Sequence, residues 1–141
     1  MFRSMVVFGI EWASVALRLV LGVEFLLHGF PKLKNLKGTA EWLATQGFKP
    51  GIFWAAVLGL TEFLGGIALL AGFATRVAAG LLIVSMVVAT LLKITKWKVP
   101  FSKGNDAGWE WDFIILGGLI ALFLLGSGIY SVDQMLGWVL G

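Results

Sequence analysis

Four long apolar stretches, separated by short polar connections, dominate the chain. They cover, in order, Trp12 to Phe30, Ile52 to Phe73, Arg76 to Leu92 and Trp109 to Gly128. Each is close to the ~20 residues that an α-helix needs to cross a bilayer, given some tilt or interfacial extension. The pattern therefore predicts an all-α fold, a polytopic membrane four-helix bundle with short interfacial helices.

Proline and glycine mark the ends of these stretches. We expect Pro31 to end the first helix, because its ring and its missing N–H oppose continuation. Pro50 and Gly51 precede the second helix, and Gly72 closes it.

Two shorter segments have helical character but are too short to span. Residues Thr39 to Gln46 put Ala40 and Leu43 on one face, with Thr39 as the expected cap. We expect this helix to lie on the membrane surface. The tail from Ser131 to Gly141 is expected to form a second interfacial helix under the bundle.

Composition supports a membrane protein and narrows its chemistry. Of the 141 residues, 59% are hydrophobic and 13% are charged, so we expect one transmembrane domain over residues 1–141. The chain has no cysteine, which excludes disulfides, thiolate chemistry and iron–sulfur ligation. Its one histidine, His28, excludes a haem held by two histidines of one subunit. We expect no metal site and no covalently bound cofactor, so a redox carrier must be a diffusible quinone or belong to a partner subunit.

Basic residues are concentrated on one side of the predicted bundle. Four spans put Arg3 and Arg76 on one side and the following lysines on the other: Lys32, Lys34, Lys37, Lys49, Lys93, Lys96, Lys98 and Lys103. The positive-inside rule then predicts a multi-pass protein of the plasma (cytoplasmic) membrane with both termini outside. We expect the first helix to be retained, since no small-residue cleavage pattern follows it. Anionic lipid headgroups, rather than nucleic acid, explain the net charge of +3.

Small residues recur four positions apart on the predicted helices. The pairs are Ala55 and Gly59, Ala68 and Gly72, and Gly117 and Ala121. This spacing lets helix backbones approach closely in lipid. We favour packing inside one bundle, and a homo-oligomer interface is the alternative.

Three charges fall near the middle of the predicted spans, where each needs a partner or a purpose: Arg18, Glu24 and Glu62. Antiparallel neighbours would bring Glu62 against Arg18 at similar depth. That contact is either a structural ion pair or part of a ligand-binding site. Glu24 has no obvious second cation at its depth, and buried alone it could carry a proton at neutral pH.

A second polar group is expected at the lysine-rich side. His28 follows Glu24 by four residues, and Lys32 follows His28 by four. Together with Glu110 at the start of the fourth helix, these residues could polarise a quinone carbonyl or relay its protons. The alternatives are an interfacial hydrogen-bonding histidine and, for Glu110 and Asp112, stabilisation of a helix N-terminus. We assign Asp112 to that structural role.

At the opposite side, Arg76 starts the third helix and Asp133 follows the fourth. A helical hairpin would bring these two ends to the same level. We therefore expect an Arg76–Asp133 salt bridge with a structural role.

Taken in chain order, these residues resemble the DoxX family of small four-helix membrane proteins. In the first half the matching positions are Arg18, Gly22, Phe25, His28-Gly29, Lys32-Leu33, Glu62, Gly65-Gly66, Leu69, Gly72, Thr75-Arg76 and Ala79. In the second half they are Glu110 and Gly126-x-Gly128-x-x-Ser131-x-Asp133. The resemblance covers nearly the whole chain, and its specificity comes from the order and spacing of pieces that are individually weak.

The resemblance implies a helical bundle and, as in some members, a membrane subunit of a thiosulfate:quinone oxidoreductase. Other members are implicated in oxidative-stress complexes, and distantly similar eukaryotic proteins act in trafficking or assembly. The family pattern draws attention to Arg18, His28, Lys32, Glu62, Arg76, Glu110 and Asp133. Glu24 is not part of that pattern.

Three functions compete at this point. The first is a quinone-linked oxidoreductase subunit that works with a soluble or membrane redox partner. The second is a solute carrier or channel, which is disfavoured because the bundle is narrow and has no inverted repeat with broken helices. The third is a non-catalytic membrane scaffold or assembly factor. We take the first as the working hypothesis, with quinone-binding candidates Arg18, His28, Lys32, Glu62 and Glu110, and the third as its alternative.

Overall fold

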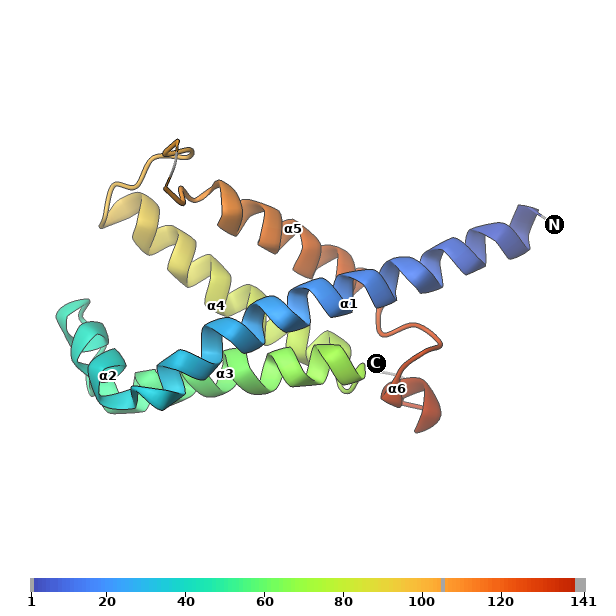
Figure 1. The fold of residues 1–141 in the computed structure, drawn as a ribbon, viewed down its shortest axis with the longest axis horizontal. Coiled ribbons are helices and arrows are strands. Elements are labelled where there is room, and N and C mark those ends of the chain that lie inside the picture. The colour runs from blue at the N-terminus through green and yellow to red at the C-terminus, as the bar shows by residue number, and fades with distance from the viewer. Residues whose placement is uncertain (1, 105, 139–141) are drawn as a thin grey trace.

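The computed structural model describes residues 2–104 and 106–138, and the described part is helical with short connections (Figure 1). Its helices are α1 (Phe2–Lys34), α2 (Leu36–Thr45), α3 (Gly51–Ala71), α4 (Thr75–Thr95), α5 (Glu110–Leu125) and α6 (Val132–Met135). Residues 139–141 of the expected interfacial tail, and the side chain of Arg3, lie outside the described residues. The all-α fold class is confirmed.

Within the described residues, three helices are long and apolar enough to cross a membrane. These are Ser4–Lys34 of α1, together with all of α3 and all of α4. The fourth predicted span, α5, has 16 residues and no charge after Asp112. It packs against α4 and α1 and completes the bundle.

The bundle has two distinct ends (Figure 1). Helix α2 lies at one end, with the C-terminal ends of α1 and α4 and the start of α5. The opposite end holds α6, the connection between α3 and α4, and the N-terminal part of α1, which extends past the other helices. The predicted lysines occur in the segments at the α2 end, which we call the lysine-rich end.

The main core joins all four long helices, because each turns an apolar stripe inward. Its buried members are Leu21, Phe25, Leu69, Ala78, Ala79, Leu82, Leu119 and Leu122. A smaller cluster of Ala40, Leu43 and Ala55 fixes α2 against α3, on the α2 face that the sequence predicts.

Glycines allow α1 and α3 to touch. A Cβ atom at Gly66 would lie 2.6 Å from the backbone nitrogen of Leu26 and 2.8 Å from the carbonyl oxygen of Gly22. A Cβ at Gly29 would collide with the backbone of Phe63. Small residues therefore allow the helices of the bundle to pack closely, as expected. Gly59 was predicted to do so, and Gly22, Gly29 and Gly66 also lie at close contacts.

Several predicted helix ends are wrong. Helix α1 begins at Phe2, ten residues before the predicted Trp12, and α5 ends at Leu125 rather than Gly128. Helix α1 continues through Pro31 to Lys34, because a proline this close to the end removes only the hydrogen bond to the carbonyl of Leu27. Asn35, rather than Thr39, caps α2, since its side chain accepts from the Gly38 N–H at 3.2 Å. Thr39 lies inside α2 and donates to the Asn35 carbonyl at 3.0 Å. Gly72 closes α3 as predicted, with a φ of 66° that favours glycine.

Candidate functional site

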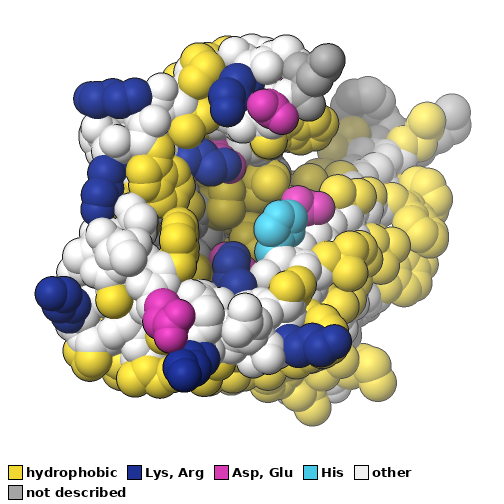
Figure 2. All heavy atoms as spheres, turned by 60° about the vertical axis from the view of Figure 1, so that its left-hand side comes forward, with side chains coloured by type: hydrophobic (Ala, Val, Ile, Leu, Met, Phe, Trp, Pro, Cys, Tyr) yellow, Lys and Arg dark blue, Asp and Glu magenta, His cyan; other side chains and the backbone are white. Residues whose placement is uncertain are grey.

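The lysine-rich end is hollowed, and side chains of both charge signs surround the hollow over an apolar floor (Figure 2). Two ion pairs join neighbouring helices at this end, one between α1 and α3 and one between α4 and α5. Each joins a partly exposed lysine to a buried carboxylate. This arrangement is the candidate site.

The first pair is Lys32 with Glu62. Lys32 belongs to the last turn of α1, and Glu62 lies eleven residues into α3, about 16 Å along that helix. The Lys32 ammonium donates to Glu62 Oε2. The Glu62 side chain is 8% exposed and that of Lys32 is 28% exposed. A carboxylate held this deep among apolar helices requires such a partner.

The second pair was not predicted. Lys93, in the last turn of α4, donates to Asp112 Oδ1 at 2.8 Å, and the Asp112 side chain is 7% exposed. The Thr90 hydroxyl lies 3.5 Å from the other oxygen of Asp112. Asp112 therefore does more than favour the N-terminus of α5. The available signal was that Lys93 ends one span and Asp112 begins the next on the same side of the membrane.

His28 and Glu24 form a separate contact on the surface of α1. Nδ1 of His28 lies 2.8 Å from the Glu24 carbonyl oxygen and 3.3 Å from Glu24 Oε1. The two side chains are 59% and 41% exposed. The condition that Glu24 be buried alone is therefore not met, since its side chain is partly exposed and lies beside His28.

Glu110 is the first residue of α5 and is half-buried. Its backbone N–H donates to the Phe101 carbonyl at 3.0 Å. Its carboxylate makes no hydrogen bond or salt bridge within residues 2–104 and 106–138. The structure thus joins only Lys32 and Glu62 among the five predicted ligand-binding residues.

Arg18 lies toward the opposite end of the bundle and is buried. Its guanidinium donates to the carbonyl oxygens of Leu69 at 3.0 Å, Ser127 at 2.7 Å, Tyr130 at 2.8 Å and Leu70 at 3.3 Å. These carbonyls belong to the end of α3 and to the segment after α5, where helix ends lack partners. Arg18 therefore ties two chain segments together.

The expected Arg18–Glu62 contact is wrong because of the register between α1 and α3. The backbone of Glu62 and Phe63 lies against Gly29 of α1. Gly29 follows Arg18 by eleven residues, about 16 Å along the helix. Glu62 consequently meets Lys32, and Arg18 meets the C-terminal turn of α3.

The expected Arg76–Asp133 salt bridge is also absent from the described residues. Asp133 is fully buried and accepts from the backbone N–H groups of Ala74 at 2.6 Å and Thr75 at 3.0 Å. It also accepts from the Thr75 hydroxyl at 3.0 Å. It therefore caps α4, where its charge opposes the positive end of the helix dipole. Arg76 Nε instead donates to the Phe123 carbonyl at 3.2 Å.

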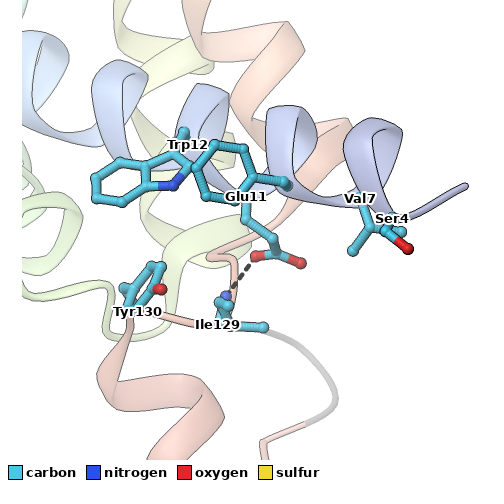
Figure 3. A pocket seen from close by; sticks show the side chains of 7 residues that line it. Ser4, Val7, Glu11, Trp12, Ile129 and Tyr130 are labelled. Atoms are coloured by element: carbon cyan, nitrogen blue, oxygen red, sulfur yellow. Dashed lines mark hydrogen bonds between the residues drawn. The ribbon is translucent and has the colours of Figure 1, made fainter. Parts of the chain in front are cut away.

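A cavity of about 500 Å³ lies beside the N-terminal part of α1, away from the lysine-rich end (Figure 3). Glu11 is the one charged residue among those that line it. Its carboxylate accepts from the Ile129 N–H, and the Trp12 and Tyr130 rings lie 5.4 Å apart. These contacts hold the segment after α5 against α1, which is a structural task.

Comparisons with known proteins agree with this architecture. The family model described as DoxX matches residues 13–94. "Putative oxidoreductase CatD" of Bacillus subtilis is 31% identical over 123 residues, which cover 87% of this chain and 86% of that protein. "Inner membrane protein YqjF" of Escherichia coli is 32% identical over 120 residues, covering 84% and 88%. "Inner membrane protein YphA" of Escherichia coli is 25% identical over 123 residues, covering 83% and 85%. No solved structure matches the chain.

The fold and these relatives define a multi-pass helical membrane protein. The chain belongs to the DoxX family.

Proposed function

We propose that this protein is the membrane subunit of a quinone-linked oxidoreductase and that Lys32 and Glu62 bind the quinone headgroup. The observation that carries the proposal is a buried carboxylate with a partly exposed ammonium inside an apolar bundle. A quinone is an apolar ring with two carbonyl acceptors, so it can dissolve in the membrane and still accept hydrogen bonds. The oxidoreductase name of the Bacillus subtilis relative supports the same class of activity.

The two side chains suit two parts of quinone chemistry. Lys32 has three N–H groups and can donate one to a quinone carbonyl while another stays on Glu62. Reduction of a quinone to a quinol takes two electrons and two protons. In this proposal the electrons come from the redox carrier of a partner subunit, and Glu62 passes protons from the lysine-rich end. Since the chain has no thiol, turnover of a sulfur substrate would occur on the partner.

Equilibrium binding tests this function in purified protein reconstituted into lipid nanodiscs. A short-chain benzoquinone should bind the wild type, and Glu62→Gln or Lys32→Met should weaken binding at least about tenfold. Asp112→Asn is the matched control, because Asp112 has the same burial and also pairs with a lysine. Binding that is unaltered in both α1–α3 variants would contradict the assignment.

A second candidate, a non-catalytic membrane scaffold or assembly factor, is favoured by one observation. Every buried side-chain nitrogen or oxygen of the described residues has a hydrogen-bond partner, so the buried polar groups can all be explained by a structural role in holding the helices together. A scaffold predicts that Glu62→Gln lowers stability or abundance without changing electron transfer in the assembled complex. A stable Glu62→Gln protein that assembles normally and lacks quinone-dependent electron transfer would exclude it.

We infer that the lysine-rich end faces the cytoplasm, because basic connections are retained on that side. The absence of native cysteine makes a direct test simple. A membrane-impermeant maleimide added to intact cells should label Gln134→Cys, which lies at the opposite end, and should leave Ser102→Cys unlabelled. The reverse result would invert the topology.

A further inference from the structure

A second feature of the lysine-rich half is an apolar groove between α3 and α4, with a cavity volume of about 270 Å³. Twelve of its fourteen lining residues are apolar, and the exceptions are Thr61 and Ser85. None of the four residues in the two buried ion pairs lines it. The groove is therefore distinct from the proposed quinone site.

The groove opens toward the surrounding membrane. On its α4 wall, Leu81 is 55% exposed, Val84 is 63% exposed and Val88 is 40% exposed. These apolar side chains lie on the outer surface of a helix that spans the bilayer, where hydrocarbon chains are the neighbours. Its volume is just below the range usual for drug-sized ligands, about 300 to 1,000 Å³, so it can hold a segment of one hydrocarbon chain.

Two tryptophans close the groove at the lysine-rich end. The rings of Trp42 on α2 and Trp97 after α4 lie 5.7 Å apart. We call this tryptophan pair the roof of the groove. Gln46 stabilises it, because its side-chain oxygen accepts from Trp97 Nε1 at 2.9 Å and its carbonyl accepts from Lys96 Nζ at 2.8 Å. Indole rings favour the level of lipid headgroups, so the roof marks where a headgroup would sit.

Several lysines of the lysine-rich end have no acidic partner within the part of the chain that the structure describes, and two of them are sequence neighbours of groove residues. Among the described residues, three lysines of this end pair with acids, namely Lys32, Lys93 and Lys103. The lysines without an acidic partner within the described ranges are Lys34, Lys37, Lys49, Lys96 and Lys98. Lys49 follows the groove residue Phe48, and Lys96 precedes the groove residue Trp97. The Lys96 ammonium bonds to a neutral carbonyl and has further N–H groups to donate.

We propose that this groove is a binding site for one anionic phospholipid, with an acyl chain along α3 and α4 and the phosphate at Lys49 and Lys96. Charge complementarity selects this occupant. An acyl chain gains little by moving from bilayer to groove, because the two surroundings are equally apolar. The preference for one lipid must therefore come from its headgroup. A lysine near an anionic lipid raises the binding affinity by a factor of about five.

Quenching of tryptophan emission by brominated lipids tests the proposal in nanodiscs. Replacing Trp12, Trp109, Trp111 and Trp138 with phenylalanine leaves the three groove tryptophans as the emitters. Phosphatidylglycerol with brominated acyl chains should reach half-maximal quenching at a mole fraction at least about fivefold lower than phosphatidylcholine with the same chains. The paired change Lys49→Gln and Lys96→Gln should remove the difference, and Lys103→Gln should keep it, since Lys103 pairs with Asp106.

A second variant separates the groove from ordinary boundary lipid. Ala89→Phe puts a ring into the groove and should abolish preferential quenching, and Val57→Phe does the same from α3 if Ala89→Phe fails to fold. Equal quenching by the two lipids would overturn the proposal, as would a preference that survives both groove-filling changes. Mass spectrometry of the lipids that remain bound to the purified protein is a further test. Retained phosphatidylglycerol is expected, and retention of a zwitterionic lipid in its place would overturn the assignment.

Discussion

Lys32 and Glu62 pair across α1 and α3, with the carboxylate side chain 8% exposed and the lysine side chain 28% exposed. The buried partner depends on the exposed one. Removing the ammonium leaves a carboxylate among apolar side chains, whereas removing both charges leaves an apolar contact that the bundle can accept.

A double-mutant cycle should reveal this dependence. Lys32→Met should lower the free energy of unfolding by about 3 kcal/mol. The double variant with Glu62→Leu should lose less than the sum of the two single changes, because neither charge is then left alone. Thermal unfolding in detergent provides the measurement. Additive losses would mean that the pair contributes no coupling energy.

Replacing Arg18 with lysine keeps the positive charge but should still destabilise the protein. Lysine cannot reach the four carbonyls that the guanidinium joins, so Arg18→Lys should cost about 2 kcal/mol or more. Arg76→Lys is the control, since Arg76 makes one carbonyl contact at the surface. Equal stability of the two variants would argue against the joining role.

The cap of α4 gives a third prediction. Asp133→Ala removes three acceptor contacts from the start of α4 and should destabilise the protein by about 1 to 2 kcal/mol. Asp106→Ala, an exposed acid in a connection, should change stability by less than about 0.5 kcal/mol. Denaturant unfolding followed by circular dichroism can compare them.

Helix contact can be tested with two glycines of opposite surroundings. Gly66→Ala should destabilise the bundle by about 1 to 3 kcal/mol, because the new methyl group would overlap the backbone of α1. Gly117→Ala meets nothing within 4 Å and should stabilise α5 by about 0.5 kcal/mol or more. If both substitutions change the stability in the same direction, Gly66 is not required for the close approach of α1 and α3.

Apolar periodicity was sufficient to predict the four long helices and the two ends of the bundle, because span length and loop charge follow from bilayer physics, but it did not predict where α1 begins and ends. It could not predict the partners of Arg18 and Glu62. The position of a residue along a helix can be estimated from the sequence. The axial register of α1 against α3 instead depends on which glycines lie at the contact between the two helices. The prediction set the middle of the Trp12–Phe30 span level with Glu62, whereas Glu62 lies against Gly29, so it placed Arg18 too near Glu62.

The candidate site was predicted in part for a similar reason. Glu62 was recognised as a charge near the middle of its span and Lys32 as a residue of the lysine-rich side, yet their pairing depends on how far the lysine side chain reaches from the last turn of α1 toward α3. Asp112 was assigned to the helix dipole because its acidity at an N-terminus already had an explanation. Its partner, Lys93, lies 19 residues earlier in the chain, across a connection whose path the sequence does not specify.

Photoaffinity labelling tests the central claim most directly. An azido-quinone is photolysed with the wild-type protein in nanodiscs, and the labelled peptides are identified by mass spectrometry. The proposed function predicts labelling around Lys32 on α1 and Glu62 on α3, competition by unlabelled quinone, and loss of labelling in Glu62→Gln but not in Asp112→Asn. Labelling spread evenly over lipid-facing residues, or unchanged in Glu62→Gln, would contradict a quinone site at this ion pair.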